Sequence, residues 1–395
     1  MSSDPDPRGP DRAALNHLKL VYFTVFASYG TTVLYQSLYW RRVGISDAGI
    51  GLLLGIQPLV TIVAGPLWSL AADRLGIRAR LLTIVTALTI LPTLGMIWLY
   101  SYPWLVVLNV LYALLWAPIQ PLMDSLALDT LGEERHRYGV VRAFGSMGYA
   151  PVAWLTGLAI QGRDIRMVFV AYALLMGLAS LLTLRMRVPQ TALGLRVGQD
   201  LGRLLRDRGW QRFMAATFVA MAVHQVTNSF GGLYLDTLGA SEGLIGFSGA
   251  IGSGVQTLLM LGALPAMLKR WGSERLLLFS FAMLALRFVL WASIPVPLLA
   301  AMNNGLLALT FGTALLAAVD YADKHAPRGL EATSQAMVSS LVTGLGRATG
   351  SMGGGALYGA LGPVNTFVIC AAVALATGLG MGASLRRRAG REASL

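Results

Sequence analysis

Long apolar runs separated by short polar breaks make up most of this chain. The hydrocarbon core of a bilayer, roughly 30 Å thick, is crossed by a helix of about 20 apolar residues, and the runs reach that length. The pattern therefore predicts an all-α membrane protein with twelve transmembrane helices. We expect these helices at residues 18–40, 47–71, 79–100, 103–128, 139–161, 165–186, 210–236, 242–268, 274–294, 297–322, 331–360 and 363–385.

Composition supports a membrane protein. Of the 395 residues, 55% are hydrophobic and only 13% are charged, whereas a soluble domain carries roughly 25% charged residues. The 45 Gly and 16 Pro fit the same class, because both are commoner in membrane helices. Residues 1–10 are polar and Pro-rich, so we expect the first apolar run to be a span and not a cleavable signal.

The positions of Lys and Arg predict the orientation. Nearly all lie on one side of the predicted spans; only Arg41, Arg42, Arg163 and Arg166 fall on the other side. Because basic loops stay in the cytoplasm, we expect a multi-pass protein of the cell inner membrane with both termini cytoplasmic. The net charge of +12 then indicates contact with anionic membrane lipid, and no nucleic-acid partner is expected.

A long basic segment divides the chain into two halves of six spans. We expect short amphipathic character in it, from Leu201, Leu204 and Leu205. The predicted organisation is a cytoplasmic N-terminal tail (1–17), an N-terminal six-helix bundle (18–186), a cytoplasmic linker (187–209), a C-terminal six-helix bundle (210–385) and a basic cytoplasmic tail (386–395).

The two halves share a sequence repeat. Leu-Tyr followed by Gly-Ile-Ser-Asp-Ala-Gly-Ile-Gly, within residues 38–51, matches Leu-Tyr followed by Gly-Ala-Ser-Glu-Gly-Leu-Ile-Gly, within residues 233–246. Arg-Leu-Gly at 74–76 matches Arg-Trp-Gly at 270–272 with nearly the same offset. Helix caps alone can repeat by coincidence, but two matched loops favour duplicated, pseudo-symmetric six-helix bundles, as in two-half transporters.

The loop after the second span resembles a known family motif. Residues 69–78, Ser-Leu-Ala-Ala-Asp-Arg-Leu-Gly-Ile-Arg, are similar to the G-x-L-x-D-R-x-G-R-[RK] loop of the major facilitator superfamily, and depart from it at Ser69 and Ile77. The resemblance implies that Asp73, Arg74 and Gly76 form a conformational gate between helix ends. The alternative is a simple turn that carries cytoplasmic charge.

Two charges near the loop between the fourth and fifth spans lie at comparable predicted depth. Asp124 precedes the loop and Arg142 follows it, so the two can pair. Tyr-Gly-x-x-Arg-x-x-Gly-Ser at 138–146, eighteen residues after an acid, resembles the branch that contains lactose, 3-phenylpropionate and nucleoside permeases. That resemblance places both residues in a substrate site; a structural pair that locks two helices is the alternative.

Further polar residues within spans are candidates for the substrate and proton pathway. The same branch implies a role in proton coupling for Arg287 and places neutral Gln256 where an acid is expected. Arg347 either lines the cavity or pairs with Asp320. Asn304 lies where it can line a cavity.

His224 belongs to a polar stripe in the seventh span, with Gln225 and Asn228. The stripe fits a ligand contact or a polar contact between helices equally well. If protons are coupled, we expect the titrating group to be Asp124, His224 or Asp320.

These features predict a secondary active transporter that works by alternating access, with proton-coupled import of a small solute. Because Arg287 and Arg347 outnumber Asp124, we expect an anionic or polyhydroxylated solute, such as an aromatic acid, a sugar or a nucleoside. The alternative is a proton-antiport exporter of drugs or metabolites, but the fifth span lacks a close antiporter pattern.

Enzyme classes find no support. No nucleotide loop of the type GxxxxGK[ST] and no nucleophile elbow occur. With one Cys and four His, no metal site and no cofactor are expected. We expect a monomer whose partners are a small-molecule substrate, protons and membrane lipid.

Overall fold

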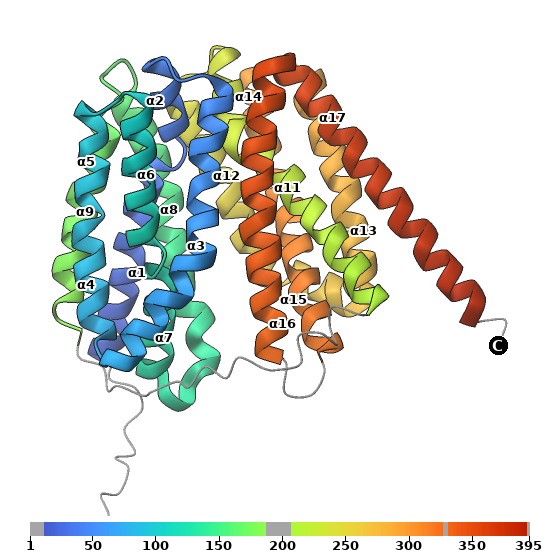
Figure 1. The fold of residues 1–395 in the computed structure, drawn as a ribbon, viewed down its shortest axis with the longest axis horizontal. Helices are drawn as coiled ribbons and strands as arrows, with labels where there is room; N and C mark the ends of the chain where they lie inside the picture. The colour runs from blue at the N-terminus through green and yellow to red at the C-terminus, as the bar shows by residue number, and fades with distance from the viewer. Residues whose placement is uncertain (1–11, 187–206, 327–330, 393–395) are drawn as a thin grey trace, which may run out of the picture.

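A computed structural model describes residues 12–186, 207–326 and 331–392, and within these ranges every regular element is a helix. The helices of the first half form one bundle and those of the second half form another beside it (Figure 1). The first six passes are α1 (Arg12–Thr32) with α2 (Gln36–Arg42), α3 (Asp47–Leu75), α4 (Arg78–Leu88) with α5 (Ile90–Trp98), α6 (Tyr102–Trp116) with α7 (Ile119–Leu131), α8 (Tyr138–Ile160) and α9 (Met167–Thr183).

The second half repeats this arrangement. The seventh pass is α11 (Arg208–Thr237), the eighth is α12 (Glu242–Met260) with the start of α13 (Ala263–Ser293), and the ninth is the rest of α13. The tenth pass runs from α14 (Pro297–Met302) to α15 (Thr313–His325). The eleventh is α16 (Glu331–Met337) with the start of α17 (Gly346–Glu392), and the twelfth is the rest of α17. The backbone turns back inside α13 at Gly272 and inside α17 at Gly362. The described residues therefore make twelve passes in two six-helix bundles, the fold expected from the sequence.

By length and composition, seven continuous helical stretches in the described part of the chain could cross a membrane. Two of them, of 59 and 54 residues, each fold back and hold two passes. Three passes of the described chain lie outside these stretches. They are the first (α1 with α2), the sixth (α9, which has 17 residues) and the seventh (α11).

The sequence repeat is also a repeat of local structure. Ser46 and Ser241 cap α3 and α12, and each side chain accepts a hydrogen bond from the backbone N–H three residues later, at 3.2 and 3.3 Å. The glycines two residues before them, Gly44 and Gly239, have φ of 89° and 82°, a region that favours glycine. The matched sequences therefore build the same turn in each half.

Two helices extend beyond their predicted limits. α1 begins at Arg12, inside the segment expected as a tail, because Leu15 and Leu18 are buried against the first bundle. α17 continues to Glu392 through the predicted basic tail; arginine and alanine are good helix formers, and cations favour a helix C-terminus. Most of the predicted linker, residues 187–206, lies outside the described residues.

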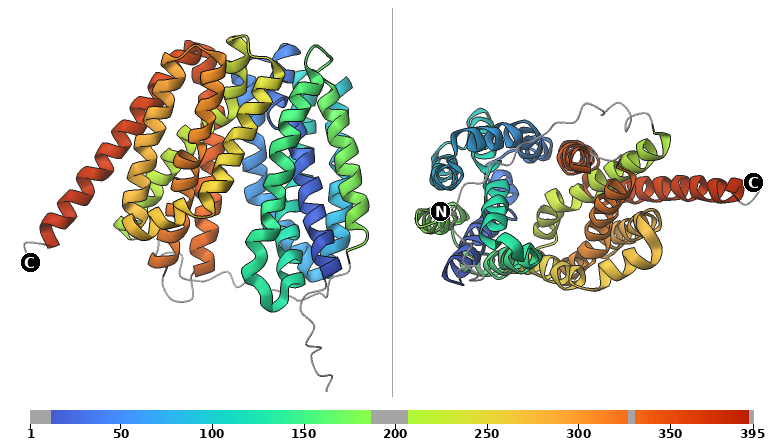
Figure 2. Two further views of the ribbon diagram at one scale, coloured as in Figure 1. Left: turned by 180° about the vertical axis from the view of Figure 1, so that it is seen from behind. Right: turned by 90° about the horizontal axis from the view of Figure 1, so that it is seen from below.

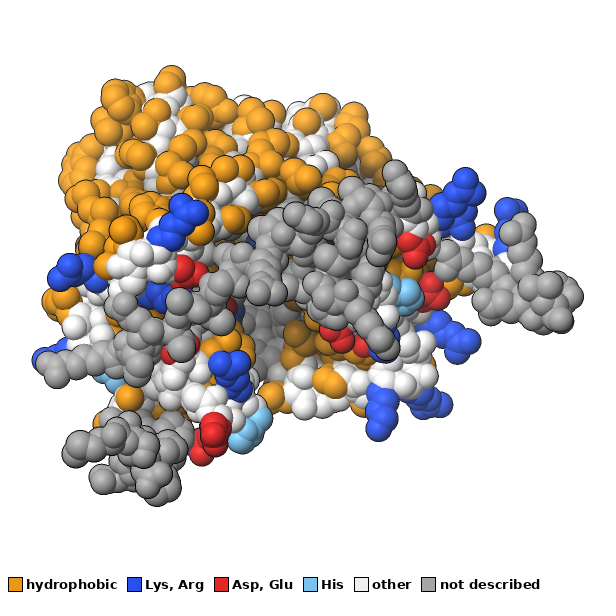
Figure 3. Space-filling view, turned by 60° about the horizontal axis from the view of Figure 1, so that its bottom comes forward, with side chains coloured by type: hydrophobic (Ala, Val, Ile, Leu, Met, Phe, Trp, Pro, Cys, Tyr) orange, Lys and Arg blue, Asp and Glu red, His pale blue; other side chains and the backbone are white. Residues whose placement is uncertain are grey.

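The surface has an apolar wall and a charged end. Leu174, Leu261 and Leu379 are more than 70% exposed on the wall, as suits contact with lipid. Lys and Arg side chains gather on the end that lies at the bottom of Figure 1, as Figure 3 shows. We call this end, where α1 begins and α15 ends, the basic face.

The two bundles are tied together at the opposite face. Arg41 donates a hydrogen bond to the carbonyl oxygen of Leu233 at 3.2 Å. Arg42 forms ion pairs with Glu242 at 2.7 Å and Asp236 at 3.8 Å. Within the described ranges, every hydrogen bond or ion pair between the bundles involves one of these two arginines, so the molecule is closed at this face.

Small residues let the bundles meet on the same side. α3 and α17 cross at Gly51 and Gly355, where an added Cβ on Gly51 would lie 2.5 Å from the carbonyl oxygen of Ser351 and 2.8 Å from the Cα of Gly355. Both neighbours are backbone atoms that cannot turn aside. The closed interface therefore requires glycine at residue 51.

We expect Gly51→Leu to lower the thermal stability of the detergent-solubilised protein, because overpacking costs about 1–3 kcal/mol. Gly353→Leu lies on the facing helix α17, two residues before Gly355, with no atom within 4 Å of its added Cβ, and should change stability by no more than about 0.5 kcal/mol. Equal melting temperatures for the two variants would contradict the close approach of α3 and α17.

Candidate functional site

A cavity of about 210 Å³ lies between the bundles and is lined mostly by the second half. The first half contributes Leu34 and Tyr149. Its polar lining comes from α11, α12, α13, the tenth pass and α17: His224, Gln225, Thr227, Asn228, Ser248, Ser253, Gln256, Arg287, Asn304 and Arg347. The structure thus brings together five of the predicted pathway residues, namely His224, Gln256, Arg287, Asn304 and Arg347.

One face of α12 forms a wall of this cavity. Gly249, Gly252, Ser253 and Gln256 line it and recur with the spacing of a single helical face. The glycines leave room, and the polar side chains are available for hydrogen bonds to a solute. An added Cβ on Gly252 would lie 3.1 Å from the carbonyl oxygen of Asn304, so α12 packs closely against the tenth pass here.

Arg287 is buried at the centre of the polar cluster, with 2% of its surface exposed. Its Nη2 donates to Oδ1 of Asn304 at 2.5 Å, and its Nη1 lies 3.3 Å from Oγ1 of Thr310 and 3.4 Å from Nδ1 of His224. Because a guanidinium only donates, Nδ1 of His224 accepts, which leaves the imidazole proton on Nε2. Asn304 donates in turn to the hydroxyl of Ser248.

A second cation, Arg347, lines the same cavity. Its Nε donates to Oε1 of Gln225 at 3.1 Å, and Nε2 of Gln225 donates to Ser229 and Ser351 at 3.1 and 3.2 Å. Asp320 instead pairs with Lys324 at 2.8 Å. Of the two interpretations of Arg347, the structure therefore favours cavity lining over a pair with Asp320.

The cavity carries positive charge without a compensating carboxylate. Among the described residues, its lining contains Arg287 and Arg347 and no Asp or Glu. The buried Nε of Arg287 and the buried Oδ1 of Asn303 have no hydrogen-bond partner within the described residues. Charges inside a membrane protein are normally paired, so an anionic or strongly hydrogen-bonding group would supply the partner that this cluster lacks among the described residues.

The backbone is irregular beside the cluster. The tenth pass changes from a 3₁₀ turn (Asn303–Leu306) to a π-helical turn (Ala308–Gly312), and a π-helical segment (Val338–Leu345) precedes Arg347. π-helical turns are rare and occur often at functional sites. Here they coincide with the helices that carry Asn304 and Arg347.

Asp124 and Arg142 lie in a separate cluster nearer the basic face. The hydroxyl of Tyr22 donates to Oδ1 of Asp124 at 2.6 Å. The guanidinium carbon of Arg142 lies 4.3 Å from the ring centroid of Phe26, and no ion pair joins Arg142 to Asp124. Neither residue lines the central cavity, so they form a polar group on the first bundle.

The loop with the family motif forms a turn that is held by ion pairs of Arg78. Asp73 pairs with Arg78 at 2.7 Å, and Arg78 also pairs with Asp129 of α7 at 3.1 Å. Arg78 is buried, whereas Arg74 is exposed. Gly76 has φ of 63° and caps α3, so the turn requires glycine. A gating role for Asp73, Arg74 and Gly76 stays a prediction.

Two members of the polar cluster around Arg287 and Asn304 were not identified as site residues from the sequence. Ser248 and Thr310 are single polar residues in apolar runs, and only the fold shows that they meet Asn304 and Arg287. A signal for Ser248 existed in α12, where small and polar residues gather in the run Gly-Phe-Ser-Gly-Ala-Ile-Gly-Ser-Gly at 246–254.

Comparison with known proteins agrees with this architecture. The sequence profile of the MFS_1 like family matches residues 15–369. The maltose permease of Geobacillus stearothermophilus is 31% identical over 331 residues, 83% of each protein. The probable 3-phenylpropionic acid transporter of Escherichia coli (strain K12) is 29% identical over 373 residues, 91% of this chain and 94% of that protein. The crystal structure of the nucleoside transporter NupG superposes with a TM-score of 0.85 and 17% identity over 94% of this chain and 98% of that one.

We expect Arg78→Gln to destabilise the protein by about 3 kcal/mol, because it leaves the carboxylates of Asp73 and Asp129 without their shared cation. Thermal unfolding in detergent measures the change. Arg74→Gln is the matched control on the same turn, and as an exposed substitution it should stay within about 0.5 kcal/mol. An equal loss in both variants would show that the ion pairs of Arg78 do not hold the turn.

Proposed function

Because the chain belongs to the MFS_1 like family of membrane transporters, we propose that it imports a small anionic or polyhydroxylated organic solute together with protons. Solute and protons would move by alternating access between the two bundles. The proposal rests above all on one observation: two arginines border one central cavity, and none of the described residues that line it is a carboxylate.

An anionic solute suits the electrostatics of this cavity. A guanidinium inside a membrane protein has lost most of its hydration, and its neutral partners Asn304, Thr310 and His224 replace only part of it. A carboxylate or phosphate on the solute would supply the missing charge and accept bidentate hydrogen bonds. The net attraction is strongest where Arg287 and Arg347 act on the same anion.

The remaining lining suits the body of such a solute. Gln256, Ser253 and Asn228 offer donors and acceptors for hydroxyl groups, and the rings of Tyr149 and Phe311 offer apolar contact. Two relatives of this chain are a maltose permease and a probable 3-phenylpropionic acid transporter. Cations, amides and aromatic rings in one cavity offer contacts to either class of solute.

The predicted domains and orientation fit this transport cycle. With the basic face in the cytoplasm of a cell with an inner membrane, the ties of Arg41 and Arg42 close the outer side and the molecule faces inward. Residues 18–186 and 210–385 would then rock as two bodies, joined by the cytoplasmic linker 187–209. The predicted tails, 1–17 and 386–395, would both lie in the cytoplasm.

Asp124 is our candidate for the proton-carrying group. Its carboxylate has a neutral hydrogen-bond donor in Tyr22 and lacks an ion pair with Arg142 in this conformation. Arg142 belongs to the same bundle, so a shift of α8 relative to α7 during the cycle would bring its guanidinium to the carboxylate. A change of partner of this kind would couple proton movement to the conformational cycle.

The test is alkalinisation of a weakly buffered medium by cells that express the protein, on addition of maltose, uridine or 3-phenylpropionate. We expect one of these solutes to raise the external pH. Asp124→Asn should abolish the pH change and solute accumulation, yet preserve exchange of labelled for unlabelled solute. Uptake without any pH change would refute proton symport, and full accumulation by Asp124→Asn would refute the role of Asp124.

Arg287→Gln should weaken solute binding by about 1.5–3 kcal/mol, the value of a hydrogen bond to a charged group, which is about 10- to 150-fold. The measurement is the concentration dependence of uptake into proteoliposomes. Arg135→Gln, an exposed change on the basic face, is the matched control and should leave uptake unaltered. An unchanged concentration dependence in Arg287→Gln would contradict a direct contact with the solute.

A further inference from the structure

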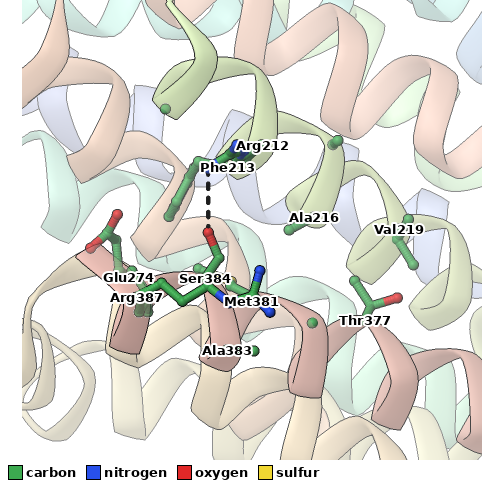
Figure 4. Close-up of a pocket in the computed structure, with 14 residues that line it drawn as sticks. Arg212, Phe213, Ala216, Val219, Glu274, Thr377, Met381, Ala383, Ser384 and Arg387 are labelled. Carbon is green, nitrogen blue, oxygen red and sulfur yellow. Dashed lines mark hydrogen bonds between the residues drawn. The ribbon is translucent and has the colours of Figure 1, made fainter. Parts of the chain in front are cut away.

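A second, larger hollow lies on the outer wall of the second bundle. It has a volume of about 730 Å³ and lies between the start of α11, the middle of α13 and the end of α17 (Figure 4). None of its lining residues borders the central cavity. We call it the lateral crevice, and it opens beside the basic face.

The tilt of the last pass creates the lateral crevice. Its apolar stretch, residues 363–385, is about 35 Å long as a helix, somewhat more than the hydrocarbon thickness of roughly 30 Å. A helix of excess length tilts, and in Figures 1 and 2 this part of α17 leans away from the body toward its C-terminal end. The gap is therefore widest at the level of the charged end.

The inner walls of the lateral crevice are apolar. Phe213, Ala216 and Val219 line it from α11, and Met381 and Leu385 line it from α17. In a bilayer, a gap of this kind between two helices is open to lipid from the side. Its depth and apolar walls suit an acyl chain.

Two arginines face each other across the mouth. Arg212 of α11 and Arg387 of α17 are exposed, and neither has an ion-pair partner within the described ranges. A hydrogen bond of 3.5 Å joins Nη1 of Arg212 to the hydroxyl of Ser384. In Figure 4 the side chain of Arg387 extends along α17 toward Ser384 and away from Glu274.

The charged residues that line the lateral crevice favour a lipid with an acidic headgroup. Glu274 is the one acid that lines the lateral crevice, against two arginines, and Arg386 adds a further cation at the end of α17. Guanidinium groups bind phosphate in a bidentate manner, and basic pockets between helices at a charged membrane face suit acidic headgroups. The mouth therefore attracts a phosphate ester that carries net negative charge.

We propose that the lateral crevice binds an anionic phospholipid of the leaflet at the basic face. Arg212, Ser384 and Arg387 hold the phosphate, and the apolar walls of α11 and α17 take an acyl chain. This binding needs only the fold and its membrane setting, so it stands whether or not the proposed solute and coupling are right.

Native mass spectrometry of the detergent-purified protein tests the site. With added phosphatidylglycerol, we expect one lipid to be retained per chain, in preference to phosphatidylethanolamine, and inorganic phosphate not to displace it. Arg212→Gln and Arg387→Gln should each reduce the retained fraction about five-fold, as expected for one cationic contact with an acidic headgroup. Arg135→Gln, an exposed change in the first half, should leave it unchanged.

A steric variant separates binding in the lateral crevice from general attraction to a basic surface. Gly380 lines the crevice, and its added Cβ would have no atom within 4 Å, so Gly380→Trp fills the space without changing charge. We expect this variant to lose the lipid and Gly353→Trp to keep it. Equal retention of both lipids by the unmodified protein, displacement by phosphate, or full retention by Gly380→Trp would overturn the proposal.

Discussion

A guanidinium held inside the membrane without a carboxylate is the constraint around which the second bundle is organised. Arg287 is buried, and its described partners, Asn304, Thr310 and His224, are neutral. The partners come from two other passes, α11 for His224 and the tenth pass for Asn304 and Thr310, so satisfying the N–H groups of one side chain fixes how α11, α13 and the tenth pass meet. The irregular turns of the tenth pass fit this demand, since a regular helix would rotate Asn304 and Thr310 to other angles.

In the first bundle, by contrast, a buried arginine is paired with carboxylates. Arg78 lies between two carboxylates, Asp73 and Asp129, and Asp124 accepts from Tyr22. These contacts stay within the first bundle, so they can persist while the two bundles move against each other. The first half thus holds internal ion pairs. The second half keeps positive charge without a described carboxylate at the cavity between the bundles, where the proposed solute would neutralise it.

The parts of this structure that depend on local sequence were predictable. Apolar length placed the twelve passes, and the repeated Gly-x-Ser-acid turns around Ser46 and Ser241 predicted two equivalent halves, because caps and positive φ angles are encoded within a few residues. Contacts across helices were not predictable in the same way. Asp124 and Arg142 have comparable depth, but depth does not fix the angle of a side chain around its helix, and Arg142 lies over Phe26. Likewise, only the turn at Gly76 shows that Arg78, and not Arg74, meets Asp73.

The closed face combines a close backbone contact with few polar ties, and this balance suits a molecule with two conformations of similar free energy. The Gly51–Gly355 crossing gains dispersion from close packing, while Arg42, which is 39% exposed, pairs with Glu242 where water competes for both charges. Exposed pairs of this kind contribute only about 0–1 kcal/mol. Opening this face therefore exchanges weak ion pairs for hydration, and the cost lies in separating the packed helices. A solute that binds Arg287 and Arg347 of the second bundle and also contacts Tyr149 of the first could offset a cost of that size, because a conformational equilibrium shifts only by the difference in binding free energy between its two states.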